Sequence, residues 1–419
     1  MFEPVGTHPD FQRKGLGKAV VVEGLRRLKA WGMKQAIVCA EHDNPAAQKL
    51  YESAGFRAIH KLCVAPTRYT FKKPIKKMEN DMTAQSKQES LLLPDAPAIP
   101  GLTLRGFRGE VDYPHMLAVI NGSKDEDGIK RSETLEEVKN NYQHLLNCDP
   151  YRDMLFAEVN GQLIAYNRVF WEQLEDKTRL YNLFGFLLPQ WRRKGIGTAM
   201  LRHAERRLRQ IAAGQPQDGE CFFQSFAADT EKGALALLES QAYQPVRYEL
   251  DMRRDLSEPF PETPMPEGLE VRPVEEAHIW QIFDAMNEAF RDHWSYRQQT
   301  REEFEGWMKS PTFKPELWKV AWEGDQVAGM VLNFVNAAEN EEYKRKRGYT
   351  EGICVRRPWR KRGLARSLIV QSMKMFKEMG MTETAHGVDA QNLSGALRLY
   401  QSVGYRHVKQ RTIFRKPMV

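Results

Sequence analysis

Cysteine is scarce in this sequence of 419 residues. The five cysteines are Cys39, Cys63, Cys148, Cys221 and Cys354. They are scattered, odd in number and form no Cys-x-x-Cys pair, which argues against both a disulfide framework and a zinc site. We therefore expect buried thiols and no bound metal.

Long apolar runs are also missing, since no stretch approaches the roughly eighteen residues that a membrane-spanning helix needs. The first residues, 1–6, lack the basic and apolar blocks of a signal peptide. Both observations favour a cytoplasmic protein that does not contact a membrane.

Charge of one sign is only slightly in excess, with 62 Lys and Arg residues against 55 Asp and Glu residues and a net charge of +7. Basic clusters at 12–14, 191–194 and 359–362 each stand directly before a glycine. Such short clusters suit a small phosphorylated ligand better than a nucleic-acid duplex. We expect no nucleic-acid partner.

An internal repeat is present in a chain whose length already predicts two or three domains. Residues 101–107 and 268–274 read as similar short strands, each followed by a helical stretch, 112–123 or 276–290. The spacing from Gly101 to Gly195 matches the spacing from Gly268 to Gly363 to within one residue. Two copies are therefore in register.

The same order of elements continues in both copies. Thr134 and Thr300 each precede a carboxylate by three residues, which predicts capped helix starts. The pairs Asn160-Gly161 and Gly324-Asp325 then predict the turns of two hairpins.

A partial third copy stands at the N-terminus, where Gly15 matches Gly195 and Gly363 but the first half of the unit has no counterpart. We predict a partial unit at 1–75, a linker at 76–99, a degenerate domain at 100–253, a proline-rich linker at 254–267 and a complete domain at 268–419. The partial unit would expose a sheet edge, which the rest of the chain or an oligomer partner would have to cover.

A basic, glycine-containing turn leads from a strand into a helix in every copy, at 12–19, 192–199 and 360–367. Small residues let the main-chain N–H groups of the turn point outward together, and the helix adds its positive dipole end. The turn is a candidate site for a pyrophosphate. A single turn of this kind would be weak evidence, because glycines also occur in ordinary tight turns.

A second motif follows in two of the copies, Asn-Pro-Ala-Ala-Gln-Lys-Leu-Tyr-Glu-Ser-Ala-Gly-Phe at 44–56 and Asn-Leu-Ser-Gly-Ala-Leu-Arg-Leu-Tyr-Gln-Ser-Val-Gly-Tyr at 392–405. Together the two motifs resemble motifs A and B of the GNAT superfamily of N-acetyltransferases. The resemblance implies an α/β (α+β) chain of tandem GNAT folds, each a mixed, mostly antiparallel sheet that splays at the CoA site between helices. It also implies acetyl-CoA as co-substrate, without a metal. Over roughly 100–419 the order resembles tandem GNAT proteins such as mycothiol synthase, in which one of two repeats does the chemistry.

The copies differ in what they retain. The middle copy has Leu238 where motif B has its tyrosine and Ala242 at the glycine, so it should lack the acid. The first copy keeps Tyr51 without the strands expected to build an amine site. We expect the last copy to be catalytic and the middle one to offer at most a second CoA site, at Phe186, Leu187, Arg193, Lys194, Gly195, Ile196, Gly197 and Thr198.

The GNAT resemblance implies that Tyr400 protonates the CoA sulfur, the alternative being a core aromatic. Glu351 is the candidate base, the alternative being a solvated carboxylate at a strand end. Asp389 and His293 are weaker candidates, and His293 with Trp294 could instead line the acceptor site. The resemblance places cofactor contacts at Ile353, Cys354, Val355, Arg360, Lys361, Arg362, Gly363, Leu364, Ala365, Arg366 and Asn392. An extra residue after Asn392 weakens the match at that position.

The sequence thus predicts an N-acetyltransferase in which an amine attacks acetyl-CoA directly in a ternary complex. The acceptor, a small-molecule or peptide amine, is not identified by any motif. A CoA-binding regulatory or scaffold protein with degenerate domains is the alternative. A nucleic-acid or ribosome-associated modifier would require the basic clusters to form one continuous stripe.

Overall fold

The computed structural model describes residues 91–392 and 395–418, together with short pieces between residues 18 and 69. The chain separates into two units, 1–86 and 87–419. In the first unit, α2 (Pro45–Ser53) places Tyr51 in a small core with Val21 and Phe56, and β1 (Val38–Cys39) pairs with β2 (Arg68–Tyr69). Of the predicted turn at 12–19, residues 12–17 and 19 lie outside the described residues.

The second unit begins with the middle repeat (residues 100–253), which follows the predicted order of elements. These are β3 (Leu102–Arg105), η2 (Glu110–Asp112), α3 (Tyr113–Lys124), α4 (Leu135–Gln143), α5 (Pro150–Asp153), β4 (Met154–Val159), β5 (Gln162–Gln173), β6 (Arg179–Leu187), η3 (Pro189–Trp191), α6 (Ile196–Ala213), β7 (Cys221–Ala228), α7 (Lys232–Ser240) and β8 (Gln244–Asp255).

The last repeat (residues 268–419) has the same order with one added helix, α10. Its elements are β9 (Glu270–Arg272), η4 (Glu276–His278), α8 (Ile279–Phe290), α9 (Arg301–Met308), η5 (Pro315–Leu317), β10 (Lys319–Glu323), β11 (Gln326–Phe334), α10 (Ala337–Glu342), β12 (Arg347–Val355), η6 (Arg357–Trp359), α11 (Leu364–Glu378), β13 (Glu383–Asp389), α12 (Ala396–Ser402) and β14 (Arg406–Pro417).

The predicted local signals are confirmed. Thr134 and Thr300 form reciprocal capping boxes with Glu137 and Glu303 at the starts of α4 and α9. The Asn160-Gly161 pair turns between β4 and β5 with φ angles of 51° and 80°, the left-handed conformation that a tight hairpin needs.

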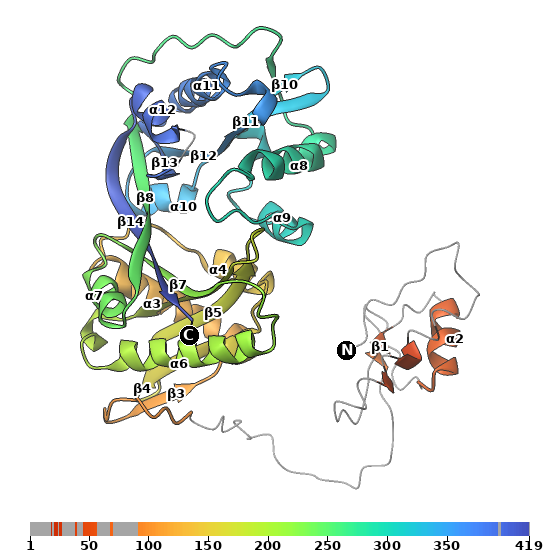
Figure 1. The fold of residues 1–419 in the computed structure, drawn as a ribbon, viewed down its shortest axis with the longest axis vertical. Helices are drawn as coiled ribbons and strands as arrows, with labels where there is room; N and C mark the ends of the chain where they lie inside the picture. Colours follow the sequence, from red (N-terminus) through yellow and green to blue (C-terminus); the bar gives the residue numbers. More distant parts are fainter. Residues whose placement is uncertain are drawn as a thin grey trace. The chain divides into compact units, whose positions relative to one another are not determined.

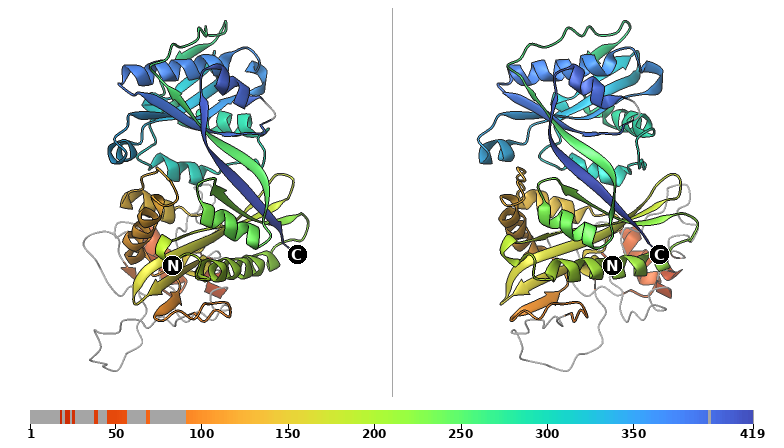
Figure 2. Two further views of the ribbon diagram at one scale, coloured as in Figure 1. Left: turned by 90° about the vertical axis from the view of Figure 1, so that its left-hand side faces the viewer. Right: turned by 60° about the vertical axis from the view of Figure 1, so that its left-hand side comes forward.

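Both repeats contribute to one sheet of twelve strands, in the order β3-β4-β5-β6-β7-β14-β8-β13-β12-β11-β10-β9. The pairs β6–β7 and β12–β13 are parallel, and the other neighbours are antiparallel. The final strand of each repeat lies beside the penultimate strand of the other, since β14 pairs with β7 and β8 with β13. Figures 1 and 2 show β8 and β14 side by side where they pass from one repeat to the other. Each repeat therefore completes the sheet of its neighbour.

The last repeat has a separate core on each face of its sheet. Ile282, Phe283 and Phe304 of α8 and α9 pack on one face, with Val320 and Met330 beneath them. The opposite face is covered by α11 and α12, whose buried side chains are Leu364, Leu368, Ile369, Val370, Met373, Phe376 and Tyr400. Helices therefore cover both faces of the sheet in the last repeat.

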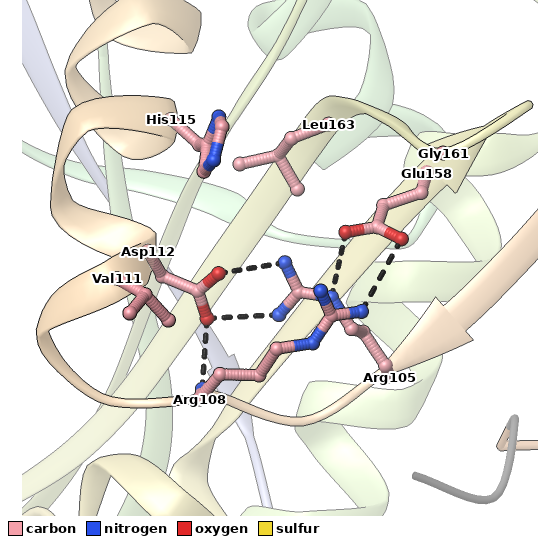
Figure 3. Close-up of a pocket in the computed structure, with 8 residues that line it drawn as sticks. All are labelled: Arg105, Arg108, Val111, Asp112, His115, Glu158, Gly161 and Leu163. Carbon is pink, nitrogen blue, oxygen red and sulfur yellow. Dashed lines mark hydrogen bonds and ion pairs between the residues drawn. The ribbon is translucent and has the colours of Figure 1, made fainter. Parts of the chain in front are cut away.

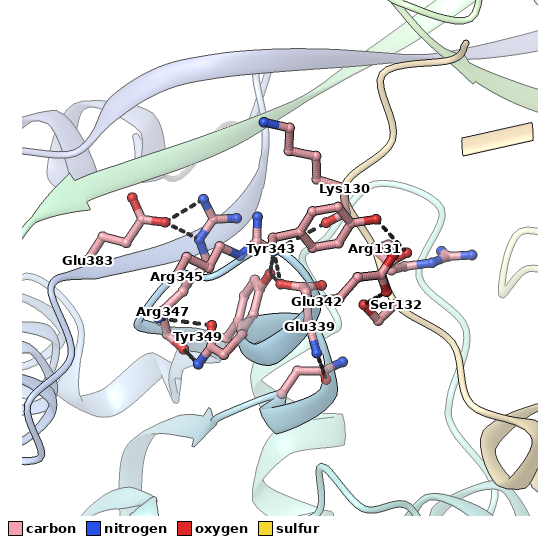
Figure 4. A network of polar contacts seen from close by, with 12 residues as sticks. Lys130, Arg131, Ser132, Glu339, Glu342, Tyr343, Arg345, Arg347, Tyr349 and Glu383 are labelled. Carbon is pink, nitrogen blue, oxygen red and sulfur yellow. Dashed lines mark hydrogen bonds and ion pairs between the residues drawn. The ribbon is translucent and has the colours of Figure 1, made fainter. Parts of the chain in front are cut away.

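A polar network joins the two repeats through α10 (Figure 4). Lys124, which is only 8% exposed, donates to Glu342 over 2.8 Å, and Ser132 donates to the same carboxylate. Arg345 reaches the Lys130 carbonyl at 3.2 Å and also pairs with Glu339. Because Lys124 is buried, removing Glu342 would leave a charge without its partner.

In the described ranges, no helix is both long and apolar enough to cross a membrane.

Candidate functional site

The strands of the last repeat diverge at one place. β12 pairs with β13 only from Arg347 to Tyr349, opposite Glu383 to Ala385, and the remaining residues of the two strands do not pair with each other. β13 continues instead along β8, up to Asp389. We call the opening beyond Tyr349 and Ala385 the fork. It leaves main-chain groups of the second half of β12 free for a ligand.

A bulge shapes the β12 side of the fork. Met330 pairs with Cys354 and Leu332 with Glu351, so Gly352 and Ile353 together oppose the single residue Val331. Gly352 has φ +57°, and a Cβ there would come within 2.8 Å of the Leu332 side chain. The bulge therefore requires glycine, and it turns the end of β12 away from regular pairing.

The 361–366 loop lies between η6 and α11, next to the end of β12. Lys361 and Gly363 adopt left-handed conformations with φ +62° and +88°. Within the described part of the chain, the main-chain N–H groups of residues 361–366 have no hydrogen-bond acceptor. Six free donors at a helix start, with the dipole of α11 behind them, form a site suited to a pyrophosphate.

The guanidinium group of Arg360 is engaged within the protein. It donates to the Val355 carbonyl at 2.9 Å, to Asp292 at 2.5 Å and to the Ala289 carbonyl at 3.0 Å. Arg360 and Arg357 together lower the pKa of Asp292. Arg360 therefore ties the strand end to the end of α8 and holds the loop in place, and its side chain has little left to offer a phosphate.

The other basic side chains of the loop differ from one another. Arg362 is exposed and donates to the Glu267 carbonyl at 2.7 Å, whereas Lys361 is exposed beside the turn. Arg366, in the first turn of α11, is half-buried, and its Nε has no partner among the described residues. Arg366 is thus a cation available to an anion at this helix start.

Tyr400 lies in α12 and is 6% exposed. Its hydroxyl has no hydrogen-bond partner among the described residues, although the ring packs in the core that α11 and α12 form. Burial raises the pKa of Tyr400, and the nearby Glu351 carboxylate raises it further. The phenol is therefore protonated at neutral pH and free to donate.

Glu351 stands just inside the fork on β12. Its carboxylate is half-buried and accepts the Gly387 N–H across the opening at 3.1 Å. Burial raises the pKa of Glu351 to about 7, and the neighbouring Asp251 and Glu249 carboxylates contribute in the same direction. A carboxyl group with a pKa near neutrality is suited to accept a proton from an amine.

The rest of the predicted cofactor segment lines the same region. Ile353, Cys354 and Val355 are the last residues of β12, and Leu364 and Ala365 begin α11. Burial raises the pKa of the Cys354 thiol to about 12, so the thiol is protonated and unreactive. Asn392 lies in the turn between β13 and α12, where its N–H donates to the Asp389 carbonyl.

The family is decided by comparison with known proteins. The model of the acetyltransferase (GNAT) family matches residues 2–56, 122–215 and 279–405, which together make up more than half of the chain. The chain belongs to the GNAT family of acetyltransferases. Each of the three matched segments lies within one copy of the repeat.

Several named acetyltransferases and GNAT proteins are similar to this chain over most of its length. A mycothiol acetyltransferase of Geodermatophilus obscurus is 25% identical over 296 residues, which cover 70% of this chain and 90% of the relative. A GCN5-related N-acetyltransferase from Sphaerobacter thermophilus superposes with a TM-score of 0.60 and 26% identity, covering 78% and 97% of the two chains. A tandem GNAT protein from the clavulanic acid pathway, at 12% identity and a TM-score of 0.51 over 75% of this chain and 98% of its own, shares the fold.

The middle repeat has the same loop before its helix α6, but it lacks counterparts of Glu351 and Tyr400. The N–H groups of residues 193–198 likewise have no acceptor within the described part, and Gly195 has φ +84°. Arg192 repeats the tie of Arg360, donating to the Leu187 carbonyl at 3.0 Å and to Asp127 at 2.7 Å. The aspartates that accept these hydrogen bonds, Asp127 and Asp292, were not predicted from the sequence.

The middle repeat has apolar residues at the positions that correspond to Glu351 and Tyr400. Counted back from the loop glycines Gly195 and Gly363, Leu183 stands at the position of Glu351, and by strand register the equally apolar Phe184 does. Aligned on motif B, Leu238 stands at the position of Tyr400. In addition, β6 pairs with β5 without any shift of register, so the bulge of β12 has no counterpart. Phe186 and Leu187, the predicted contacts, lie at the end of this regular strand.

The middle repeat also contains a polar cavity of about 170 Å³ (Figure 3). Arg105 is buried at its centre and pairs with both Asp112 and Glu158 over 2.7 Å. Since these charges satisfy one another, the cluster fastens β3 and β4 to η2 and is structural.

The weaker candidates lie toward the α8–α9 face of the last repeat. Asp389 is 8% exposed and is held by Arg247 through two hydrogen bonds of 2.9 and 2.6 Å, so it is not free to accept a proton. His293 lines a cavity of about 380 Å³ between α8 and α9, and Trp294 stacks against Arg247 and Arg415. Among the described residues, no group of His, Cys, Asp and Glu is arranged to hold a metal ion.

Proposed function

We propose that the last repeat transfers the acetyl group of acetyl-CoA to an amine by direct attack in a ternary complex. The observation that carries this proposal is the fork, which has six unpaired N–H groups on one side and the free hydroxyl of Tyr400 with the carboxyl group of Glu351 in its opening. GNAT enzymes in general use acetyl-CoA, and no resident metal or cofactor is needed for this chemistry.

The loop and the strand end would hold the thioester. The N–H groups of residues 361–366, with the cation of Arg366, would bind the pyrophosphate. The irregular end of β12, residues 353–355, would offer main-chain groups to the pantetheine and to the thioester carbonyl. Asn392, at the far side of the fork, is a further candidate contact.

The reaction then needs a base and an acid. Glu351 takes one proton from the amine, the amine nitrogen bonds to the acetyl carbon, and the carbon–sulfur bond breaks. The electron pair left on sulfur takes the proton of the Tyr400 hydroxyl. Because the pKa of Tyr400 is raised, the phenol keeps its proton until the thiolate forms.

The acceptor would enter from the α8–α9 face, where the cavity lined by His293 lies. We propose a small-molecule or peptide amine as the acceptor. Because similar proteins are named mycothiol acetyltransferases, mycothiol-related amines are the first compound class to test.

We further propose that the middle repeat binds CoA without catalysis. Its loop keeps the six N–H donors of residues 193–198, whereas Leu183 and Leu238 can neither accept nor donate a proton. This arrangement favours a regulatory or structural role for that repeat, which is the role that the alternative hypothesis from the sequence gave to degenerate domains.

Calorimetric titration of the full chain with CoA and a thiol-release assay across an amine panel test the proposal. Tyr400→Phe should keep CoA affinity while turnover falls by about 10²–10⁴. Tyr51→Phe, at the same motif position in the N-terminal copy, is the matched control and should leave turnover unchanged. A chain without measurable CoA binding, or a Tyr400→Phe variant with full turnover at its optimum pH, would contradict the assignment.

A further inference from the structure

His386 is a buried histidine to which the reaction above gives no role. It lies in β13 directly after Ala385, the last residue of that strand to pair with β12, and only 3% of it is exposed. The ring stands between two tyrosines, with its centroid 4.0 Å from that of Tyr400 and 4.2 Å from that of Tyr405. His386 is therefore part of the wall on which the Tyr400 phenol rests.

One ring nitrogen of His386 has a hydrogen-bond partner. Nδ1 lies 3.4 Å from the Oγ1 atom of Thr350, and this oxygen lies 2.7 Å from the hydroxyl of Tyr405. When Tyr405 donates to Thr350 and Thr350 donates to Nδ1, the single proton of the neutral imidazole is on Nε2. The three side chains then form a chain of donors that ends at His386.

The other nitrogen, Nε2, is buried and has no partner in the part of the chain that the structure describes. Burial also lowers the pKa of His386 to about 3, so the ring is neutral under physiological conditions. A buried polar atom without a hydrogen bond lowers stability. Its presence beside the candidate acid suggests that its partner forms during the reaction.

Protonation of the CoA sulfur creates such a partner. The O–H bond of Tyr400 breaks, an S–H bond forms, and the electron pair stays on the phenol oxygen as a buried negative charge. The titratable groups facing Tyr400 are Glu351 and Cys354 on β12, Tyr405 after α12, and His386. At this stage Glu351 is neutral, because it has taken the proton of the amine, and it already accepts the Gly387 N–H. Tyr405 is already bonded to Thr350, whereas the ring of His386 lies against that of Tyr400 with its Nε2–H group unused.

We propose that neutral His386 donates a hydrogen bond from Nε2 to the Tyr400 oxygen as that oxygen becomes negative. His386 is thus a positioning residue that acts through Tyr400 and transfers no proton itself, and Thr350 selects its tautomer. This inference rests on the proposed function of Tyr400.

The acidity of the phenol can be measured without knowledge of the acceptor. A fluorinated, more acidic tyrosine is incorporated at position 400 of the full chain, and its ¹⁹F shift is followed against pH. His386→Phe keeps an aromatic ring but removes the donor, so the phenol should become an about ten-fold weaker acid. His386→Gln, which keeps an N–H donor, should recover most of the acidity.

Turnover of acetyl-CoA with an amine found in the panel provides the second readout. His386→Phe should lower kcat by about ten-fold or more while KM for acetyl-CoA stays within about two-fold. Thr350→Val, which removes only the bond that fixes the tautomer, should lower kcat by less. Thr412→Val removes a buried hydroxyl of β14 for which no hydrogen bond to His386, Thr350 or Tyr405 is found among the described residues, and it is the control.

The outcomes separate this inference from the proposed function. If His386→Phe leaves both the ¹⁹F titration and kcat unchanged, the role of His386 is wrong and that of Tyr400 stands. If the parent chain fails to bind CoA, the proposed function itself is wrong. Should His386→Phe not fold, the comparison of His386→Gln and Thr350→Val with the parent decides the question, because unchanged acidity in Thr350→Val contradicts the tautomer argument.

Discussion

At the scale of single residues, Glu351 shows a conflict between stability and chemistry. In the unfolded chain its carboxyl group loses its proton near pH 4.5, whereas in the folded chain burial holds the proton until about pH 7. Its contribution to stability is therefore fully present below pH 4.5 and is lost as the pH rises to about 7. Carboxyl groups with a pKa shifted in this way are typical of functional sites, which favours the role of a base over that of a structural carboxylate.

Glu351→Gln should separate the two effects. Because a neutral amide has no charge to bury, the free energy of unfolding should rise by about 1–3 kcal/mol at pH 8 and change little at pH 4.5. Turnover should fall by about 10²–10⁴, and the rise of kcat with pH through about 7 should disappear. Urea unfolding at the two pH values and a pH–rate profile provide the measurements.

The control for this prediction is Glu341→Gln, which changes an exposed carboxylate of α10. It should alter neither stability nor the pH profile. A Glu351→Gln variant that is less stable than the parent at pH 8 would show that the carboxylate is held by favourable contacts and is not destabilised by burial.

At the scale of elements, α11 depends on two glycines with the same backbone conformation at its opposite ends. Gly363 before the helix and Gly380 after it have φ +88° and +79°, and a Cβ at either position would meet no atom within 4 Å. A β-branched residue in this conformation is strained, so Gly363→Val and Gly380→Val should each cost about 1–2 kcal/mol of stability.

Only one of these substitutions should affect the ligand. Gly363→Val should displace the N–H groups of the 361–366 loop and weaken CoA binding by about ten-fold or more, whereas Gly380→Val should bind CoA as the parent does. Calorimetric titration of both variants with CoA, alongside thermal unfolding, makes the comparison. Equal affinities would mean that the loop conformation does not matter for binding.

Much of this element-level structure could be predicted from the sequence, because local signals govern it. Capping residues such as Thr134 and Thr300, the hairpin turn at Asn160-Gly161 and the loop glycine Gly363 act over a few neighbouring residues. The family resemblance predicted a shared site for Tyr400 and Glu351, and the two side chains are close enough for the carboxylate to raise the pKa of the phenol. The boundaries predicted for the domains, by contrast, describe sequence copies, and the sheet runs across them.

What the sequence did not reveal depends on long-range contacts. Nothing in the basic cluster around Arg360 distinguishes a phosphate ligand from a tie to Asp292, since the partner lies in another element. The unpaired Nε2 of His386 is likewise visible only after packing. The exchange of β8 and β14 has no local signature, because either strand could have paired within its own repeat.

At the scale of the whole second unit, this exchange makes the two repeats interdependent. β8 belongs to the middle repeat by sequence but fills the place between β13 and β14, so it forms part of the sheet that carries the fork of the last repeat. The middle repeat therefore supplies a strand to the sheet of the last repeat, whether or not it binds CoA. The network of Lys124 and Glu342 adds a second contact between the repeats.

A truncation series tests this dependence. Residues 268–419 alone lack β8, so β13 and β14 would lose their common neighbour and each would expose an unpaired edge. This fragment should aggregate or show no CoA-dependent rise in Tm. A fragment of 244–419 regains β8 and should recover part of the CoA response, although β14 still lacks β7, and residues 87–419 should recover all of it. If 268–419 proves monomeric, folded and as active as the full chain, the fork does not depend on the exchanged strand, and the repeats are independent domains that merely share a sheet.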